Sequence, residues 1–171
     1  MALILETQRL ILRQPDARDV DDFVRFYGDD RSQHTGGPID GTAAWLLLAC
    51  EIGHWTLKGF GTWAVCDKTA PDASLGMVGC WQPGGAPERE LGWLIWPKAE
   101  GKGFASEAAI AARDDAFTRL RFNSLSSYIT HANTRSIALA ERIGAVRDLS
   151  SNARSETFYA YRHPAPEVPR G

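Results

Sequence analysis

The sequence predicts one mixed α/β domain, in which a mostly antiparallel sheet of seven strands packs against four helices. The chain has 171 residues, 44% of them hydrophobic and 23% charged, which suits a single globular domain with a sizeable core. Its apolar patterns follow the order strand, two helices, three strands, helix, strand, helix, two strands. Three consecutive strands imply antiparallel pairing, and the strand–helix–strand unit over 89–131 implies one parallel pair.

The first part of the chain supplies one strand and two helices. Residues 9–13 form a short apolar strand, after which Asp16 is suited to cap a helix. The inner face of that helix has the i, i+3, i+4, i+7 spacing, with Val20, Phe23, Val24 and Tyr27. Segment 31–41 is rich in turn residues and predicts no regular element. A second helix follows over 42–57, with Ala44, Leu48, Ile52 and Trp55 on its inner face.

The rest of the chain alternates strands with two further helices. The predicted strands are 61–67, 75–81, 88–96, 125–131, 145–149 and 157–162, and the predicted helices are 105–120 and 133–144. A polar turn is expected around Pro71 and Asp72, and Pro97 ends the strand before it because proline cannot donate to a ladder. We expect one domain over 1–163, followed by a loose proline-rich tail over 164–171.

Charge and cysteine content exclude several classes of protein. A net charge of -2 gives no general attraction to nucleic acid or to anionic membranes. The chain has three cysteines and no CxxC pair, so we expect reduced thiols and no metal site. Glu6 interrupts any apolar signal segment, and no apolar run reaches the length of a membrane span. A cytoplasmic protein, monomeric or homodimeric through a free strand edge, is therefore expected.

The segment from Glu90 to Glu107 carries the chemistry. A strand runs into a loop containing Gly101 and Gly103, and the loop runs directly into a helix. Amides of a first helical turn, together with the helix dipole, favour an anion such as a pyrophosphate. A GxG before a helix is by itself more often a tight turn than a phosphate-binding site. The segment matches neither the P-loop nor the dinucleotide motif, because Ser106 stands where a third glycine is needed.

The segment KAEGKGFASEA resembles the acetyl-CoA-binding motif Q/R-x-x-G-x-G/A of the GNAT superfamily of acetyltransferases. Gly101 and Gly103 take the two glycine positions, and Lys98 replaces the usual Gln or Arg. Five further segments resemble the branch of ribosomal-protein N-terminal acetyltransferases: QRLILR, GHW…KGFGTWAV, ELGWLIWP, NTRSIALAERIGA and YRHP. These segments span nearly the whole chain in the family's order.

The resemblance implies a sheet that splays between its fourth and fifth strands, with the pantetheine arm of acetyl-CoA in the splay. It implies hydrogen bonds from the arm to the fourth strand around Leu94, Ile95 and Trp96. A backbone N–H near Leu94 or Ile95 would polarise the thioester carbonyl. The pyrophosphate would bind the amides of Glu100, Gly101, Lys102, Gly103, Phe104 and Ala105, and Lys98 is a further implied cofactor contact.

Attack of an amine on a thioester requires a proton acceptor and a polarised carbonyl, and needs no covalent enzyme intermediate. Glu90 lies at the family's glutamate position and is the candidate general base; alternatively, it is an exposed strand-end residue. Asn133 and Ser136 match an N-x-x-S pattern of this branch, which implies contacts with the pantetheine arm and the cofactor sulfur. Ser136 is also a candidate catalytic group, because Ala140 stands where many relatives have a tyrosine acid.

The acceptor is an amine, either a protein N-terminal α-amine or a small-molecule amine. Candidate acceptor contacts are His34, Trp55, Trp63 and Trp93. Aromatic residues at such spacing are more often core, and a loop histidine is more often solvated. A second hypothesis is a non-catalytic acyl-CoA-binding sensor of the same fold. A nucleotide-binding oxidoreductase is disfavoured by the strand order and by the missing third glycine.

Overall fold

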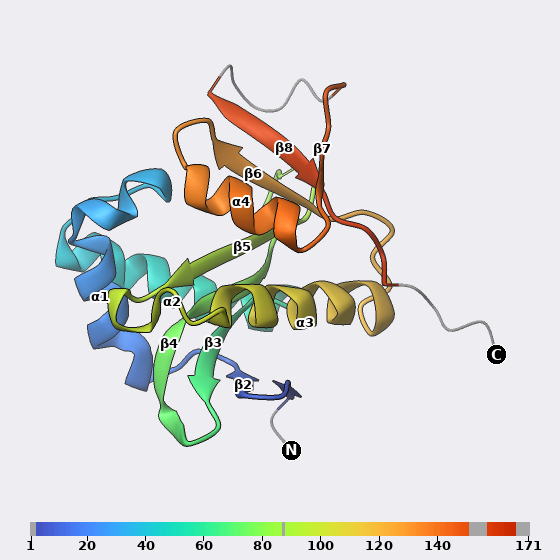
Figure 1. Ribbon diagram of the computed structural model, residues 1–171. Coiled ribbons are helices and arrows are strands. Elements are labelled where there is room, and N and C mark those ends of the chain that lie inside the picture. The colour runs from blue at the N-terminus through green and yellow to red at the C-terminus, as the bar shows by residue number, and fades with distance from the viewer. Residues whose placement is uncertain (1–2, 87, 151–156, 167–171) are drawn as a thin grey trace.

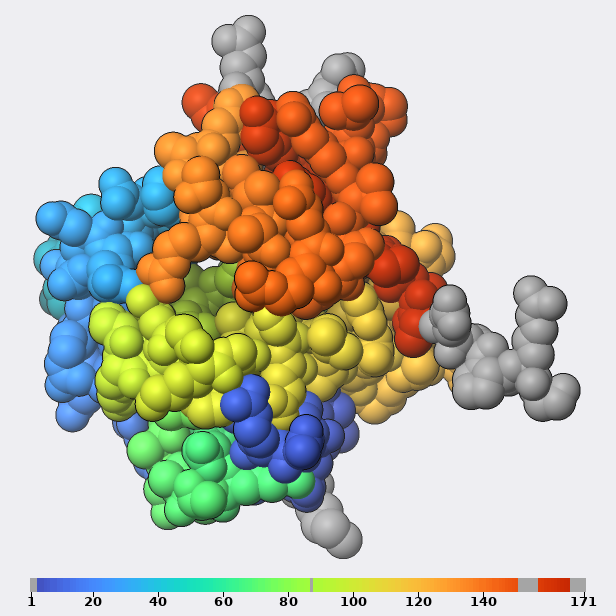
Figure 2. All heavy atoms as spheres, in the orientation of Figure 1, coloured from blue at the N-terminus to red at the C-terminus, as the bar shows by residue number. Residues whose placement is uncertain are grey.

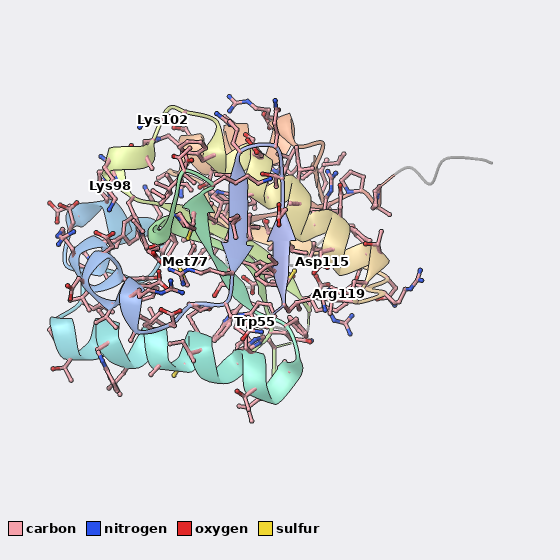
Figure 3. The ribbon with its side chains drawn as sticks, turned by 90° about the horizontal axis from the view of Figure 1, so that it is seen from below. Trp55, Met77, Lys98, Lys102, Asp115 and Arg119 are labelled. Carbon is pink, nitrogen blue, oxygen red and sulfur yellow. The ribbon has the colours of Figure 1, made fainter. Side chains whose placement is uncertain are left out.

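The structure is a computed structural model that describes residues 3–86, 88–150 and 157–166. One sheet lies between two layers of helices, with α3 and α4 on one face and α1 and α2 on the other (Figures 1 and 3). The strands are β1 Ile4–Glu6, β2 Leu10–Arg13, β3 Thr62–Asp67, β4 Ala70–Trp81, β5 Glu90–Ile95, β6 Ser126–Thr130, β7 Val146–Arg147 and β8 Phe158–Arg162. The α-helices are α1 Val20–Tyr27, α2 Gly41–Lys58, α3 Phe104–Thr118 and α4 Thr134–Arg142, and the 3-10 turns are η1 Ala17–Asp19, η2 Asp30–His34 and η3 Pro97–Ala99.

The sheet has the order β1-β2-β3-β4-β5-β6-β8-β7, and only β5 and β6 pair in parallel. The mixed, mostly antiparallel topology is as the sequence predicts. The strand count differs, because the described part of the chain contains eight strands where seven are expected. The additional strand is β1, which folds back onto β2 through a turn in which the Thr7 N–H bonds the Leu10 carbonyl at 3.0 Å. Three residues are too few to show a period-2 pattern.

The expected splay lies between β5 and β6. Their register contains one pair, Glu90 with Ser126, after which the two strands diverge (Figure 1). The expected domain boundary at residue 163 stays a prediction; β8 ends at Arg162, and residues 167–171 of the expected tail lie outside the described part.

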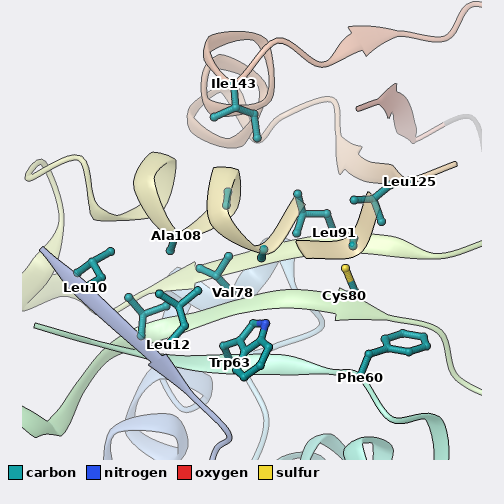
Figure 4. Close-up of a cluster of buried hydrophobic side chains, with 14 of the residues drawn as sticks. Leu10, Leu12, Phe60, Trp63, Val78, Cys80, Leu91, Ala108, Leu125 and Ile143 are labelled. Atoms are coloured by element: carbon teal, nitrogen blue, oxygen red, sulfur yellow. The ribbon is translucent and has the colours of Figure 1, made fainter. Parts of the chain in front are cut away.

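Two apolar clusters pack on opposite faces of the sheet. The first joins β2–β5 to α3 and includes Leu12, Val78 and Ala108 (Figure 4). The second joins α1 and α2 to the other face and includes Phe23 and Met77. Two of the free thiols, Cys66 and Cys80, are buried in strands, and Cys50 is exposed on α2.

Three local expectations are wrong. Pro71 and Asp72 lie within β4, whose register with β3 is irregular near Cys66 and Asp67 and so admits polar residues in a strand. The 31–41 segment contains the 3-10 turn η2, in which the Asp29 side chain accepts from the Arg31 N–H. Ile52 is 37% exposed, and its neighbour Glu51 faces the sheet instead.

The C-terminal half of α2 is fixed to one residue of β3. Trp55 donates its indole N–H to the Thr62 carbonyl at 2.7 Å, and one helical turn earlier Glu51 accepts from the Thr62 hydroxyl. Gly79, opposite Thr62, lets the backbones of β3 and β4 approach closely here, because a Cβ at Gly79 would lie 2.4 Å from the Gly61 carbonyl oxygen. The β3 residue that anchors α2 therefore has a glycine opposite it in β4, where a larger residue would overlap the β3 backbone.

Gly79→Ala should lower the free energy of unfolding by about 1–3 kcal/mol, because the new methyl group overlaps the backbone of β3. Gly92→Ala is the matched control: Gly92 pairs with Gly79 across β4 and β5, but a Cβ there meets no atom within 4 Å. Its stability should stay the same or rise slightly. Urea unfolding of both variants checks this, and equal midpoints would contradict it.

Candidate active site

The edge of β5 that faces the splay carries unpaired backbone groups. In the antiparallel pair of β4 and β5 alternate residues bond the partner strand, and the Trp96 N–H bonds the Leu75 carbonyl at 2.8 Å. The same alternation turns the N–H of Leu94 toward β4. It turns the N–H groups of Trp93 and Ile95 toward the splay. Of the two backbone donors expected from the sequence, Ile95 thus faces the splay and Leu94 does not.

The closed end of the splay is fixed by Ser127 and His163. The Ser127 hydroxyl donates to the Leu91 carbonyl at 2.5 Å, and His163 Nε2 lies 2.8 Å from the Ser127 hydroxyl oxygen. Because the serine hydrogen is committed to Leu91, the imidazole is the donor in the second bond. Burial, with a smaller contribution from the Arg113 charge, lowers the pKa of His163 to about 4, so the ring is neutral at physiological pH.

The open end of the splay leads to the glycine loop. Gly101 and Gly103 have φ of +75° and +80°, in the left-handed region that favours glycine. No side chain caps the first turn of α3, which begins at Phe104. Figure 2 shows the surface hollowed between this loop, α4 and the η2 segment, with β5 at the floor. The first-turn amides of α3 therefore lie at the mouth of the hollow without a side-chain partner, an arrangement that suits an anion.

Arg9 and Glu107 brace this loop from outside, and the sequence pattern does not reveal them. The Arg9 guanidinium bonds Glu107 at 2.7 Å and the Lys102 carbonyl at 3.0 Å, and it stacks on the ring of Phe104. Thr7 adds a hydroxyl bond to Glu107 at 2.5 Å. Partial burial alone would raise the pKa of Glu107, but these bonds hold that pKa below its ordinary value. The loop is thereby held in place before any ligand binds.

Two expected cofactor contacts have protein partners at the mouth of the hollow. Glu100 forms ion pairs with Arg31 of η2 and with Arg135 of α4, the latter at 2.8 Å. Partial burial alone would raise the pKa of Glu100, but the two guanidinium groups hold that pKa below its ordinary value. Lys98 forms an ion pair with Asp22 of α1 at 2.6 Å. Lys98 and Lys102 lie along the same loop in Figure 3.

Asn133, Ser136 and Trp93 lie on the α4 side of the splay. The Asn133 side chain caps α4 by accepting from the Ser136 N–H at 3.2 Å, as the sequence predicts for a helix cap. The Ser136 hydroxyl oxygen accepts from the indole N–H of Trp93 at 3.1 Å. This bond uses the oxygen of Ser136 and leaves its hydrogen available to a ligand.

The opposite face of β5, toward α1 and α2, carries the remaining candidates. Glu90, Gly92 and Leu94 alternate onto this face. Glu90 is half-buried, and Gly92 is exposed with open space where its side chain would lie. His34 of η2 lies 3.0 Å from the Thr130 hydroxyl, at the end of β6. Both aromatic candidates in α2 and β3, Trp55 and Trp63, are core residues in mutual ring contact.

Glu51 is a second carboxylate on this face that sequence reasoning missed. Glu51 lies three residues after Leu48 and four before Trp55, two buried residues of α2. These spacings place Glu51 on the buried face of the helix, and they were the signal that the sequence offered. Burial raises the pKa of Glu51 to about 7, against the opposing hydrogen bond from Thr62. The carboxyl group therefore changes charge near neutral pH.

The model of the acetyltransferase (GNAT) domain family matches residues 9–146. The chain belongs to the GNAT acetyltransferase family. A similar solved structure is an acetyltransferase of Agrobacterium tumefaciens, with 33% identity, a TM-score of 0.88, and coverage of 96% of this chain and 95% of that one. The GNAT-family acetyltransferase of Bacillus anthracis is 20% identical with a TM-score of 0.74, covering 94% and 96%.

A fold relative of this GNAT chain carries a cofactor. The ribosomal L7/L12 α-N-protein acetyltransferase RimL, in complex with coenzyme A, has 14% identity, a TM-score of 0.75, and coverage of 95% and 98%. At this identity the likeness concerns the fold alone. Among the described residues of the GNAT chain, no three His, Cys, Asp or Glu side chains are grouped to hold a metal ion. Nor does any helix in the described ranges have the length and apolar character to cross a membrane.

Glu51→Gln should stabilise the protein increasingly as the pH rises. The folded carboxyl has a pKa of about 7 against the ordinary 4.5, so wild-type stability falls as the pH rises through that interval. The neutral amide keeps an acceptor for Thr62 and escapes this loss, which amounts to at most about 3 kcal/mol. Denaturant unfolding at pH 4.5 and pH 8 measures the difference. A gap between variant and wild type that does not widen with pH would contradict it.

Proposed function

We propose that the protein transfers the acetyl group of acetyl-CoA to a primary amine by direct attack in a ternary complex. One observation carries the proposal. The unpaired edge of β5 leads into the left-handed glycine loop and the uncapped start of α3, which gives an extended thioester arm and its pyrophosphate one continuous path. Family membership and a fold relative that binds coenzyme A support the same cofactor.

The path has a direction. The pyrophosphate would bind the amides from Gly101 to Ala105, so the pantetheine arm would enter the splay past Ile95 and extend toward Leu91. Strand-like bonds to the N–H of Ile95 would hold the arm, as in β-strand addition. The backbone N–H of Trp93, deeper in the splay, would then polarise the thioester carbonyl.

The acceptor amine would approach from the α1–α2 face, over the bare backbone of Gly92. Glu90 stands two residues away on that face, about 7 Å along the strand. It is therefore the proposed proton acceptor for the attacking amine, acting through a water. On the other side, Ser136 would donate its free hydrogen to the departing thiolate, whose ordinary pKa of about 8.5 requires little assistance.

Release of free coenzyme A with a panel of peptide N-terminal amines and small amines tests the proposal. Turnover with any primary amine, together with the acetylated product by mass, is the expected result. Tight binding of acetyl-CoA without turnover on any amine would instead favour a non-catalytic acyl-CoA sensor.

Glu90→Gln should lower kcat by about 10²-fold, with the largest loss at low pH, where deprotonation of the amine limits the rate. The measurement is a pH–rate profile for one acceptor at saturating acetyl-CoA. Glu141→Gln, an exposed change on α4, serves as control. A profile for Glu90→Gln that keeps the wild-type shape and height would reject the role.

Arg9→Ala should raise the KM for acetyl-CoA about fivefold, because the loop loses its brace to Glu107 and to the Lys102 carbonyl. The KM for the acceptor should change less, since Arg9 lies on the cofactor side. Arg142→Ala, an exposed arginine at the end of α4, is the matched control. Equal cofactor KM values in the two variants would show that the loop needs no brace.

A further inference from the structure

The carboxylate of Glu51 is held at one oxygen and available at the other. Its Oε2 accepts from the Thr62 hydroxyl, and the Trp55 bond to the same residue fixes the helix one turn later. Its Oε1 has no hydrogen-bond partner among the described residues. This oxygen is not fully enclosed by protein, because it is absent from the buried polar atoms that lack a partner. No described lysine or arginine forms an ion pair with this carboxylate. When Glu51 is ionised, no described lysine or arginine therefore neutralises its charge.

The sheet register relates Thr62, which holds this carboxylate, to Gly92, where a Cβ would meet no atom within 4 Å. Thr62 pairs with Gly79, and Gly79 pairs with Gly92, so the three residues form one row across β3, β4 and β5. The row spans two strand spacings, about 10 Å. Neither Gly79 nor Gly92 carries a side chain that could separate Glu51 from the space over β5.

Two other groups on the α1–α2 face bring no positive charge to the carboxylate. Tyr27 of α1 is buried, and burial raises the pKa of its phenol to about 12, with a smaller contribution from the charge of Glu51. The tyrosine therefore stays neutral at physiological pH. Glu90 of β5 lies on the same face of the sheet. Thr62, Tyr27 and Glu90 therefore supply no cation to Glu51.

We propose that Glu51 is a specificity-determining residue that binds a second, positively charged group of the acceptor, about 10 Å from the reacting amine. The acceptor class is then a diamine, or an amine that bears a distant ammonium or guanidinium. This inference rests on the proposed function, because it locates the reacting amine over Gly92.

The ionisation behaviour of Glu51 agrees with this role. Burial disfavours the free carboxylate and raises its pKa to about 7. A bound cation offsets the hydration that burial removes and favours the ionised form. Binding of a dicationic acceptor should accordingly strengthen between pH 6 and pH 8, as Glu51 loses its proton.

The test compares matched acceptors with wild type, Glu51→Gln and the control Asp21→Asn, an exposed carboxylate of α1. Coenzyme A release at pH 8 gives kcat and KM for α,ω-diamines and for n-alkylamines of equal chain length. For wild type and control, kcat/KM for the best diamine should exceed that of its monoamine about tenfold or more, mainly through KM. In Glu51→Gln this ratio should approach one. A wild-type ratio near one, or a ratio that Glu51→Gln preserves, would overturn the inference.

A binding measurement separates this inference from the proposed function. Calorimetry of the same diamines and monoamines is run on the complex with coenzyme A, for all three proteins. Diamine binding to wild type that is lost in Glu51→Gln, without turnover of any amine, would retain the site and reject the acetyl transfer. Turnover of monoamines and diamines alike, with equal binding in both proteins, would retain the acetyl transfer and reject the role of Glu51.

Discussion

The parting of β5 from β6 is the constraint on which the candidate site depends. A parallel neighbour would normally consume every outward backbone group of β5, but only Glu90 and Ser126 pair. The Ser127 hydroxyl, held by a neutral His163, bonds Leu91 just beyond that pair and marks where the two strands separate. From there to the glycine loop, one edge of β5 is bonded to β4, and the backbone groups of the other edge face the splay.

A second constraint is the position of α2. Its Trp55 and Glu51 both bond Thr62, and the two residues that continue the row from Thr62 to β5, Gly79 and Gly92, have no side chain. The two faces of β5 consequently differ. The α3–α4 face offers Trp93 bonded to Ser136, whereas the α1–α2 face offers carboxylates and a bare glycine.

Local pattern was sufficient for most of the fold. The period change from strands to the alanine-rich α3 and the caps of α4 follow from residue spacing, and resemblance to the GNAT family supplied the splay. The glycine loop was also accessible to sequence reasoning, since glycines before a helix anticipate the positive φ of Gly101 and Gly103. The seven-strand count missed β1, because three residues give no period to detect. Contacts between distant segments were out of reach: Arg9 and Glu107 are 98 positions apart. Glu51 was missed because a glutamate in a helix is ordinarily a surface residue.

Because of the free edge of β5, the sheet lacks a neighbouring strand along most of one side of β5. If the pantetheine arm adds to that edge as proposed, the ligand supplies the strand that the polypeptide omits. Cofactor binding and completion of the fold then share one set of hydrogen bonds, so cofactor concentration would set the resistance of the C-terminal β6–β8 half to opening. A cell depleted of the cofactor would hold this protein in a looser form, more readily exposed to proteolysis.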